Sequence, residues 1–216
     1  MSLKKDDLVQ IEYTASIKRT GEIFDTTNPD LGQKIGLREL VKPRIIIIGA
    51  QMIIEGLERE LLKHKVGEEF TVSLDSNQAF GERQKELVKV FNKNLLIKQN
   101  INPYPGLMVE IENMKAKVLS VSGGRVRLDF NHPLSGKQVE YAVKINKKIE
   151  DKTEYIKTIL EQRIGIIDAK ITLTTTKATI KTKQELPEQI IKILSEEIKK
   201  YTKLESIFNP KKEEKK

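Results

Sequence analysis

Apolar and polar residues alternate along several short segments within the first 145 residues. In residues 7–17 the alternation places one apolar set on the same side: Val9, Ile11, Tyr13 and Ala15. Successive side chains of a strand point to opposite faces, so this pattern predicts a half-buried strand with Tyr13 on its apolar face. The same reasoning predicts strands over residues 22–25, 44–48, 68–74 and 139–145, with a loop over residues 26–32.

A short helix is predicted to begin near residue 53. The apolar positions are Ile53, Ile54, Leu57 and Leu61, and the opposite face would carry Glu58, Arg59, Glu60 and Lys63. Three large apolar residues in a row, Met52, Ile53 and Ile54, therefore lie where a loop enters a helix, a place that is normally in contact with water. Two interpretations stay open: Ile53 and Ile54 close the core, or they form the floor of an open pocket.

The pattern changes at residue 87 and again at residue 151. Short alternating segments with a Ser-Gly-Gly hairpin predict a small β meander over residues 87–130. Beyond residue 151, helical spacing over residues 155–164 and 186–201 flanks two Thr-containing strands at residues 169–175 and 177–182. This order predicts a separate α-β-β-α domain, with a frayed chain from Lys203 onward.

The composition excludes several kinds of chemistry. The 216 residues include no cysteine and two histidines, so disulfides, thiol catalysis and cysteine-bound metals are excluded. We expect His132 to order its loop and His64 to be solvated, and we expect no metal and no cofactor. No apolar run approaches the ~18 residues of a membrane span, and the N-terminus enters a strand pattern directly. These features predict an intracellular protein located in the cytoplasm, without a membrane partner.

The net charge of +8 has two interpretations. It can mark a surface for an anionic partner such as RNA or the ribosome. The basic residues are interspersed with acids, however, and 32% of the chain is charged. Such a composition also suits a heat-adapted protein rich in ion pairs, and we favour this interpretation over nucleic-acid binding.

The order of several residues resembles that of the FKBP-type peptidyl-prolyl cis-trans isomerases. The motifs are Tyr13, Phe24-Asp25, residues 49–56, Ala79-Phe80-Gly81 and Tyr141. Residues 87–130 resemble the insert-in-flap domain of SlyD-type members, and the extra C-terminal region is similar to that of long archaeal members. The resemblance implies an α+β fold, in which an FKBP-like antiparallel sheet wraps a short helix. It implies three domains: an isomerase domain of residues 1–86 plus 131–150, a β-rich chaperone insert of residues 87–130, and a C-terminal domain of residues 151–216.

The resemblance also implies a prolyl pocket and the roles of its residues. Catalysis would involve Tyr13, Asp25, Ile54, Phe80 and Tyr141, and the substrate would contact Phe24, Ile53 and Leu57. The Tyr13 hydroxyl and the Asp25 carboxylate would bond to each other, and the Ile54 N–H would hold a substrate carbonyl. Taken one at a time, Phe24, Ile53 and Phe80 are more often core residues, and Asp25 is more often a turn residue. Only the joint order of these residues along the chain favours roles in the pocket over roles in the core or in a turn.

The insert offers more apolar side chains than a domain of its size can enclose. We expect a client-binding surface formed by Val90, Phe91, Leu96, Ile97, Tyr104, Met108 and Met114, which would capture unfolded segments by strand addition. The alternative is that these residues form the core of the insert. The expected partners are unfolded or nascent chains with Xaa-Pro bonds, and a second copy bound through the C-terminal domain. The alternative functions are a holding chaperone with weak catalysis, because Leu57 replaces the usual tryptophan, and an RNA- or ribosome-associated folding factor.

Overall fold

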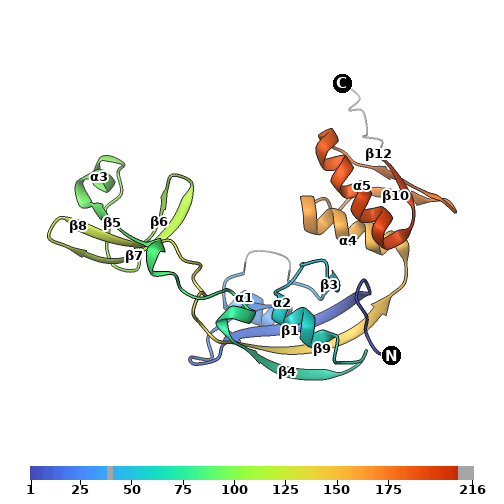
Figure 1. Cartoon of the computed structure of the whole chain (residues 1–216), viewed down its shortest axis with the longest axis horizontal. Helices are drawn as coiled ribbons and strands as arrows, with labels where there is room; N and C mark the ends of the chain where they lie inside the picture. The colour runs from blue at the N-terminus through green and yellow to red at the C-terminus, as the bar shows by residue number, and fades with distance from the viewer. Residues whose placement is uncertain (38–40, 209–216) are drawn as a thin grey trace. The chain divides into compact units, whose positions relative to one another are not determined.

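The computed structural model describes residues 1–37 and 41–208 and consists of two compact units (Figure 1). Residues 1–73 and 140–216 form the first unit, and residues 74–139 form the second. No helix in the described part of the chain is long and apolar enough to cross a membrane.

A mainly antiparallel sheet forms the base of the first unit. Its order is β2 (Ile23–Thr26), β1 (Leu8–Ile17), β9 (Val139–Ile149) and β4 (Glu69–Leu74), and β3 (Arg44–Ile47) also pairs with β1. Along β1 the side chains of Val9, Ile11, Tyr13 and Ala15 are buried, which confirms the predicted alternation. Helix α2 (Glu55–Leu61) lies on one face of this sheet (Figure 1) and buries Leu57 and Leu61.

One short helix occupies part of the predicted loop after β2. Helix α1 (Pro29–Lys34) begins at Asn28, whose side chain accepts a hydrogen bond from the Leu31 N–H at 3.1 Å. Proline at the first helical position needs no backbone donor there, which favours this start. The prediction of an irregular loop was therefore wrong for residues 29–32, the first four residues of this helix.

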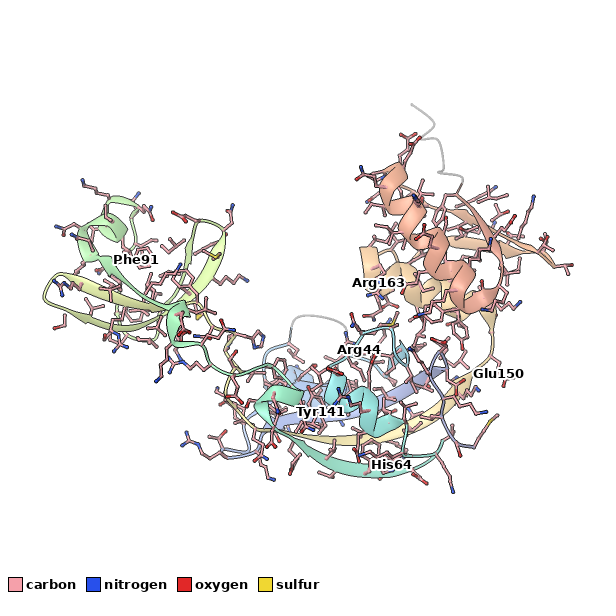
Figure 2. The ribbon with its side chains drawn as sticks, viewed as in Figure 1. Arg44, His64, Phe91, Tyr141, Glu150 and Arg163 are labelled. Carbon is pink, nitrogen blue, oxygen red and sulfur yellow. The ribbon has the colours of Figure 1, made fainter. Side chains whose placement is uncertain are left out.

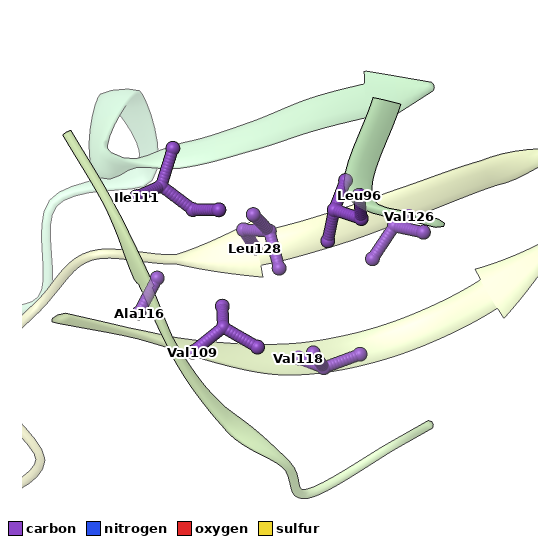
Figure 3. Close-up of a cluster of buried hydrophobic side chains, with 7 residues drawn as sticks. All are labelled: Leu96, Val109, Ile111, Ala116, Val118, Val126 and Leu128. Carbon is purple, nitrogen blue, oxygen red and sulfur yellow. The ribbon is translucent and has the colours of Figure 1, made fainter. Parts of the chain in front are cut away.

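A four-stranded antiparallel sheet forms the second unit, in the order β5 (Val88–Asn92), β8 (Arg125–Asp129), β7 (Met114–Ser122) and β6 (Met108–Ile111). Helix α3 (Lys93–Lys98), which the sequence pattern did not predict, follows β5. The core of this sheet, drawn in Figure 3, consists of Leu96, Val109, Ile111, Ala116, Val118, Val126 and Leu128. Strands β5 and β6 are the two edges.

The second unit extends beyond the predicted insert at both ends. It begins with two short 3-10 helices, η1 (Ser76–Gln78) and η2 (Lys85–Leu87). Around them, the Arg83 guanidinium contacts the Asp129 carboxylate at 2.7 Å, and the Asn131 side chain bonds to both backbone groups of Gln84 at 2.9 Å. These bonds join the two chain segments that enter and leave the sheet.

The C-terminal part of the first unit contains one strand more than the predicted α-β-β-α order. Helix α4 (Lys152–Ile164) is followed by β10 (Lys170–Leu173), β11 (Lys177–Lys181) and α5 (Glu188–Thr202). Residues 205–208, predicted to be frayed, instead form β12 (Glu205–Phe208), which pairs in parallel with β11. Alternate residues of β12 are partly buried. Strand β12 is one edge of a three-stranded sheet in the order β10, β11 and β12. The rest of the predicted frayed tail, residues 209–216, lies outside the described residues.

Candidate active site

Tyr13 and Asp25 lie on neighbouring strands and are joined by a hydrogen bond. Strands β1 and β2 pair Ala15 with Asp25, so Tyr13 and Asp25 are diagonal neighbours on the same face. The Tyr13 hydroxyl donates to Asp25 Oδ2 at 2.7 Å. Burial, reinforced by this bond and by the Asp25 charge, raises the pKa of Tyr13 to about 12. The alternative role of Asp25 as a turn residue is excluded, because Asp25 is within β2 and its carboxylate faces Tyr13.

Arg44 is a third member of this cluster that the sequence analysis missed. Arg44 pairs with Ile11 across β1 and β3, which places its side chain on the same face as Tyr13. Its Nη1 donates to the Tyr13 hydroxyl at 3.1 Å. A single arginine at the start of the β-branched run of residues 44–48 is the signal that could have identified it. Figure 2 labels Arg44 and Tyr141 within this unit.

Two further aromatic rings extend the cluster beside Tyr13. The centre of the Tyr141 ring lies 5.8 Å from that of Tyr13, and Phe24 meets Tyr141 edge to face at 6.1 Å. Burial is also the main reason why the pKa of Tyr141 is raised. Four predicted site residues, Tyr13, Phe24, Asp25 and Tyr141, therefore form one cluster.

The loop that enters α2 divides its apolar residues between core and surface. Met52 is buried, and its Sδ accepts the Ile47 N–H at 3.4 Å. Ile53 and Ile54 remain half-buried, so they do not simply close the core. Ile54 has extended backbone geometry and caps α2. Within residues 1–37 and 41–208, no protein group accepts a hydrogen bond from the Ile54 N–H, which leaves this donor available for a ligand.

Leu57 and Glu58 are both buried beneath this loop. Leu57, a predicted substrate contact, is 1% exposed. The expectation that Glu58 faces solvent was wrong, because it is 7% exposed and its carboxylate accepts the Gln51 N–H at 3.1 Å. Burial raises the pKa of Glu58, while bonds from the backbone of Gly49, Gln51 and Met52 act in the opposite direction. Glu58 therefore holds the loop that carries Ile53 and Ile54.

Phe80 belongs to the second unit, so its contribution to the prolyl pocket stays a prediction. Its ring stacks on that of His132 at 4.8 Å, and its carbonyl accepts a hydrogen bond from Ser135. His132 Nδ1 accepts the Leu134 N–H at 3.2 Å, so this histidine orders its loop. His64, in contrast, is not simply solvated, because it stacks on Phe70 at 3.8 Å.

An open cleft of about 580 Å³ lies directly beside the Tyr13 and Asp25 pair. It is lined by Tyr13, Asp25, Pro43, Arg44 and Ile45, among other residues. The cluster combines a hydrogen-bonded carboxylate with aromatic rings and contains no activated nucleophile. It is suited to binding and orienting an uncharged group rather than to attacking it.

The predicted client-binding surface of the insert is mostly exposed, with one clear error. Val90 is 61% exposed and Tyr104 is 59% exposed, and Ile97, Met108 and Met114 are about half exposed. Leu96 is only 1% exposed and belongs to the core of the insert, because α3 turns it onto the sheet. Phe91 is half-buried against that core.

Two family descriptions match the chain. Residues 1–100 match the FKBP-type peptidyl-prolyl cis-trans isomerases, and residues 94–134 match the IF domain of FKBP26. The C-terminal region after residue 134 lies outside both matches.

Known proteins with similar sequences carry related names. A SlyD FKBP-type isomerase of Treponema pallidum is 30% identical over 149 residues, which cover 67% of this chain and 77% of that protein. A short-type isomerase of Methanocaldococcus jannaschii is 29% identical over 147 residues, covering 66% of this chain and 92% of that protein. A 16 kDa FKBP-type isomerase of Escherichia coli is 29% identical over 108 residues, which cover 48% of this chain and 72% of that protein.

Proposed function

The chain belongs to the FKBP-type peptidyl-prolyl cis-trans isomerases, and we propose that it rotates Xaa-Pro bonds at the Tyr13 and Asp25 site while its insert holds unfolded protein chains. The observation that carries the first part is the 2.7 Å hydrogen bond between Tyr13 and Asp25 in the wall of the cleft. The bond fixes a carboxylate beside a partly apolar surface without any nucleophile.

The reaction requires binding and desolvation rather than proton transfer. The barrier to rotation, roughly 18–20 kcal/mol, comes from amide resonance, which separates charge between oxygen and nitrogen. An apolar environment disfavours this charge-separated planar form relative to the twisted state, in which resonance is lost. In our proposal Phe24, Ile53, Ile54 and Tyr141 supply that environment. The apolar residues that line the cleft itself are others, among them Pro43 and Ile45.

Two polar groups would orient the substrate in this environment. The Ile54 N–H, which has no protein acceptor among the described residues, would bind a substrate carbonyl. The Asp25 carboxylate, held by Tyr13, would lie beside the twisted carbonyl carbon and stabilise it electrostatically. Tyr13 would thus act by positioning Asp25, and Leu57 would support the pocket from below.

The test is the isomerisation of a proline-containing tetrapeptide by wild-type, Asp25→Ala and Tyr13→Phe chains. We expect Tyr13→Phe to lower kcat/KM by about 10- to 100-fold, because a hydrogen bond to a charged group contributes about 1.5–3 kcal/mol. Asp25→Ala should lower it at least as much. Tyr201→Phe, which removes a hydroxyl on α5, serves as the matched control. Full activity of Asp25→Ala in a folded sample would exclude this site.

The second part of the proposal assigns client capture to the insert. Both edge strands, β5 and β6, carry exposed apolar residues, namely Val90 and Met108. Unpaired edge strands can bind an extended peptide by adding it to the sheet, and neighbouring apolar side chains then contact its side chains. The clients would be nascent or stress-unfolded chains of the cytoplasm, held without ATP.

Comparison of two substrates separates capture from catalysis. We expect a proline-limited refolding protein to be isomerised with a higher kcat/KM than the tetrapeptide, because capture by the insert raises the local concentration of prolyl bonds. Asp25→Ala should abolish this acceleration but still suppress client aggregation. Loss of both activities together, in a folded variant, would contradict the separation of roles.

A further inference from the structure

Helix α4 of the C-terminal region lines the same cleft as Tyr13 and Asp25. Glu161 and Gln162, in the last turn of α4, form part of the wall of the cleft. Gln162 Oε1 accepts a hydrogen bond from Arg44 Nη2 at 3.4 Å, and the other Arg44 nitrogen, Nη1, donates to Tyr13 at 3.1 Å. A chain of hydrogen bonds therefore runs from α4 through Arg44 and Tyr13 to Asp25.

Several contacts hold α4 in place along the first sheet. At its start, the Tyr155 hydroxyl accepts the Leu8 N–H at 2.9 Å and donates to the Asp6 carbonyl at 3.0 Å. At its end, Arg163, labelled in Figure 2, donates to the Ala50 carbonyl at 2.9 Å and pairs with Glu197 of α5. Gln162 is thus presented to Arg44 by a helix that is fixed at both ends.

We propose that α4 is part of the isomerase site and that Gln162 is a positioning residue, which holds the Arg44 guanidinium on the Tyr13 hydroxyl. This inference rests on the proposed isomerase function and adds the C-terminal region to it. Arg44 needs such a partner because arginine has a long flexible side chain that loses much rotational freedom when it is fixed. The two ends of its planar guanidinium suit two acceptors at once. Without Gln162, Arg44 leaves Tyr13, and Tyr13 holds Asp25 less firmly.

The inference is tested in the full chain by a double-mutant cycle on kcat/KM for a tetrapeptide. Gln162→Ala should lower kcat/KM about 3- to 10-fold, because the hydrogen bond from the charged guanidinium is long, at 3.4 Å, and therefore weak. In an Arg44→Met background the same change should have no further effect, because the two residues act in series. Gln162→Glu keeps an acceptor for Arg44 and should retain activity within about twofold of wild type.

A second readout distinguishes positioning from loss of packing. The NMR signal of the Tyr13 ring carbon that carries the hydroxyl responds to hydrogen bonds on that oxygen. It should shift in Gln162→Ala and stay in place in Lys157→Ala, which changes an exposed residue of the same helix paired with Glu154. Three results would overturn the inference: an equal loss of kcat/KM on Gln162→Ala in the wild-type and Arg44→Met backgrounds, no loss in wild type, or a Tyr13 signal that does not move in Gln162→Ala. Each of them would leave the proposed function intact. A wild-type chain without turnover would instead overturn the proposed function and this inference together.

Discussion

The Tyr13 hydroxyl donates a hydrogen bond to Asp25 and accepts one from Arg44. These two neighbours have opposite effects on the pKa of Tyr13. Burial and Asp25 raise the pKa, whereas Arg44 lowers it, and the balance is a value of about 12. The hydroxyl therefore remains a donor to Asp25 throughout the neutral range. Its role in the site depends on keeping this proton.

The raised pKa of Tyr13 predicts a loss of stability at high pH. The unfolded chain releases the Tyr13 proton near pH 10, whereas the folded chain keeps it until about pH 12. The contribution is complete below pH 10 and is lost as the pH rises from 10 through 12, because only the unfolded state gains from ionisation there. Between pH 9 and pH 11.5 we expect the free energy of unfolding of wild type to fall by about 2 kcal/mol more than that of Tyr13→Phe. Denaturant melts at both pH values would measure it, and parallel curves for the two chains would show that Tyr13 is not the group responsible.

At the level of single residues, the sequence predicted the aromatic and acidic members of the site better than its supporting groups. Tyr13, Phe24, Asp25 and Tyr141 come together as expected, because strand alternation determines which face each side chain occupies. Arg44, Glu58 and Gln162 were missed. Glu58 is buried only because three backbone N–H groups of the preceding loop face it, and a helical pattern contains no information about such partners.

Among the elements, the strands other than β12 agree closely with the sequence prediction, and the shortest helices do not. Helices α1 and α3 have six residues each, fewer than two turns, so the helical period cannot be recognised in them. Their caps were nevertheless visible, since Asn28 and Asn92 each accept a backbone hydrogen bond at the helix start. Capping residues are the better signal for helices of this length.

Within the insert, helix α3 contains a core residue, Leu96, next to an exposed apolar residue, Ile97, which a client would contact in our proposal. We expect Leu96→Ala to destabilise the insert by about 2–5 kcal/mol, because it leaves a cavity in the core. Met108→Thr on the exposed edge should change stability by less than about 0.5 kcal/mol and weaken suppression of client aggregation. Thermal unfolding and a light-scattering assay would measure the two effects. Equal destabilisation by both substitutions would indicate that Met108 is a packing residue.

For the whole molecule, self-association through the C-terminal region remains a prediction. Helix α5 buries Leu194 and Ile198 but leaves Ile193 58% exposed. Strand β12 contacts α5 and so covers part of the apolar surface of this helix. Sedimentation of the intact chain should give twice its 24.7 kDa mass, and Ile193→Glu should give a monomer. Ile167→Glu, on an exposed loop of the same region, is the matched control, and a wild-type monomer would exclude the dimer.

Contacts between distant parts of the chain were beyond sequence reasoning. The bonds from α4 to Arg44 and to Ala50 join residues more than 100 positions apart, and no local pattern specifies such a partner. The family resemblance covered the first 150 residues, and sequence reasoning assigned the C-terminal region no catalytic role, only a predicted role in dimerisation. The structure places that region against the cleft.

The position of β9 in the first sheet has a consequence for folding during synthesis. This strand lies between β1 and β4, yet it comprises residues 139–149 and is made after the whole insert. The four strands of the insert come from one continuous stretch, residues 88–129, which is complete before β9 is made. Because domains generally fold as units during synthesis, the insert can be complete while the first sheet still lacks a central strand. A newly made chain would therefore acquire its proposed client-holding surface before its isomerase site.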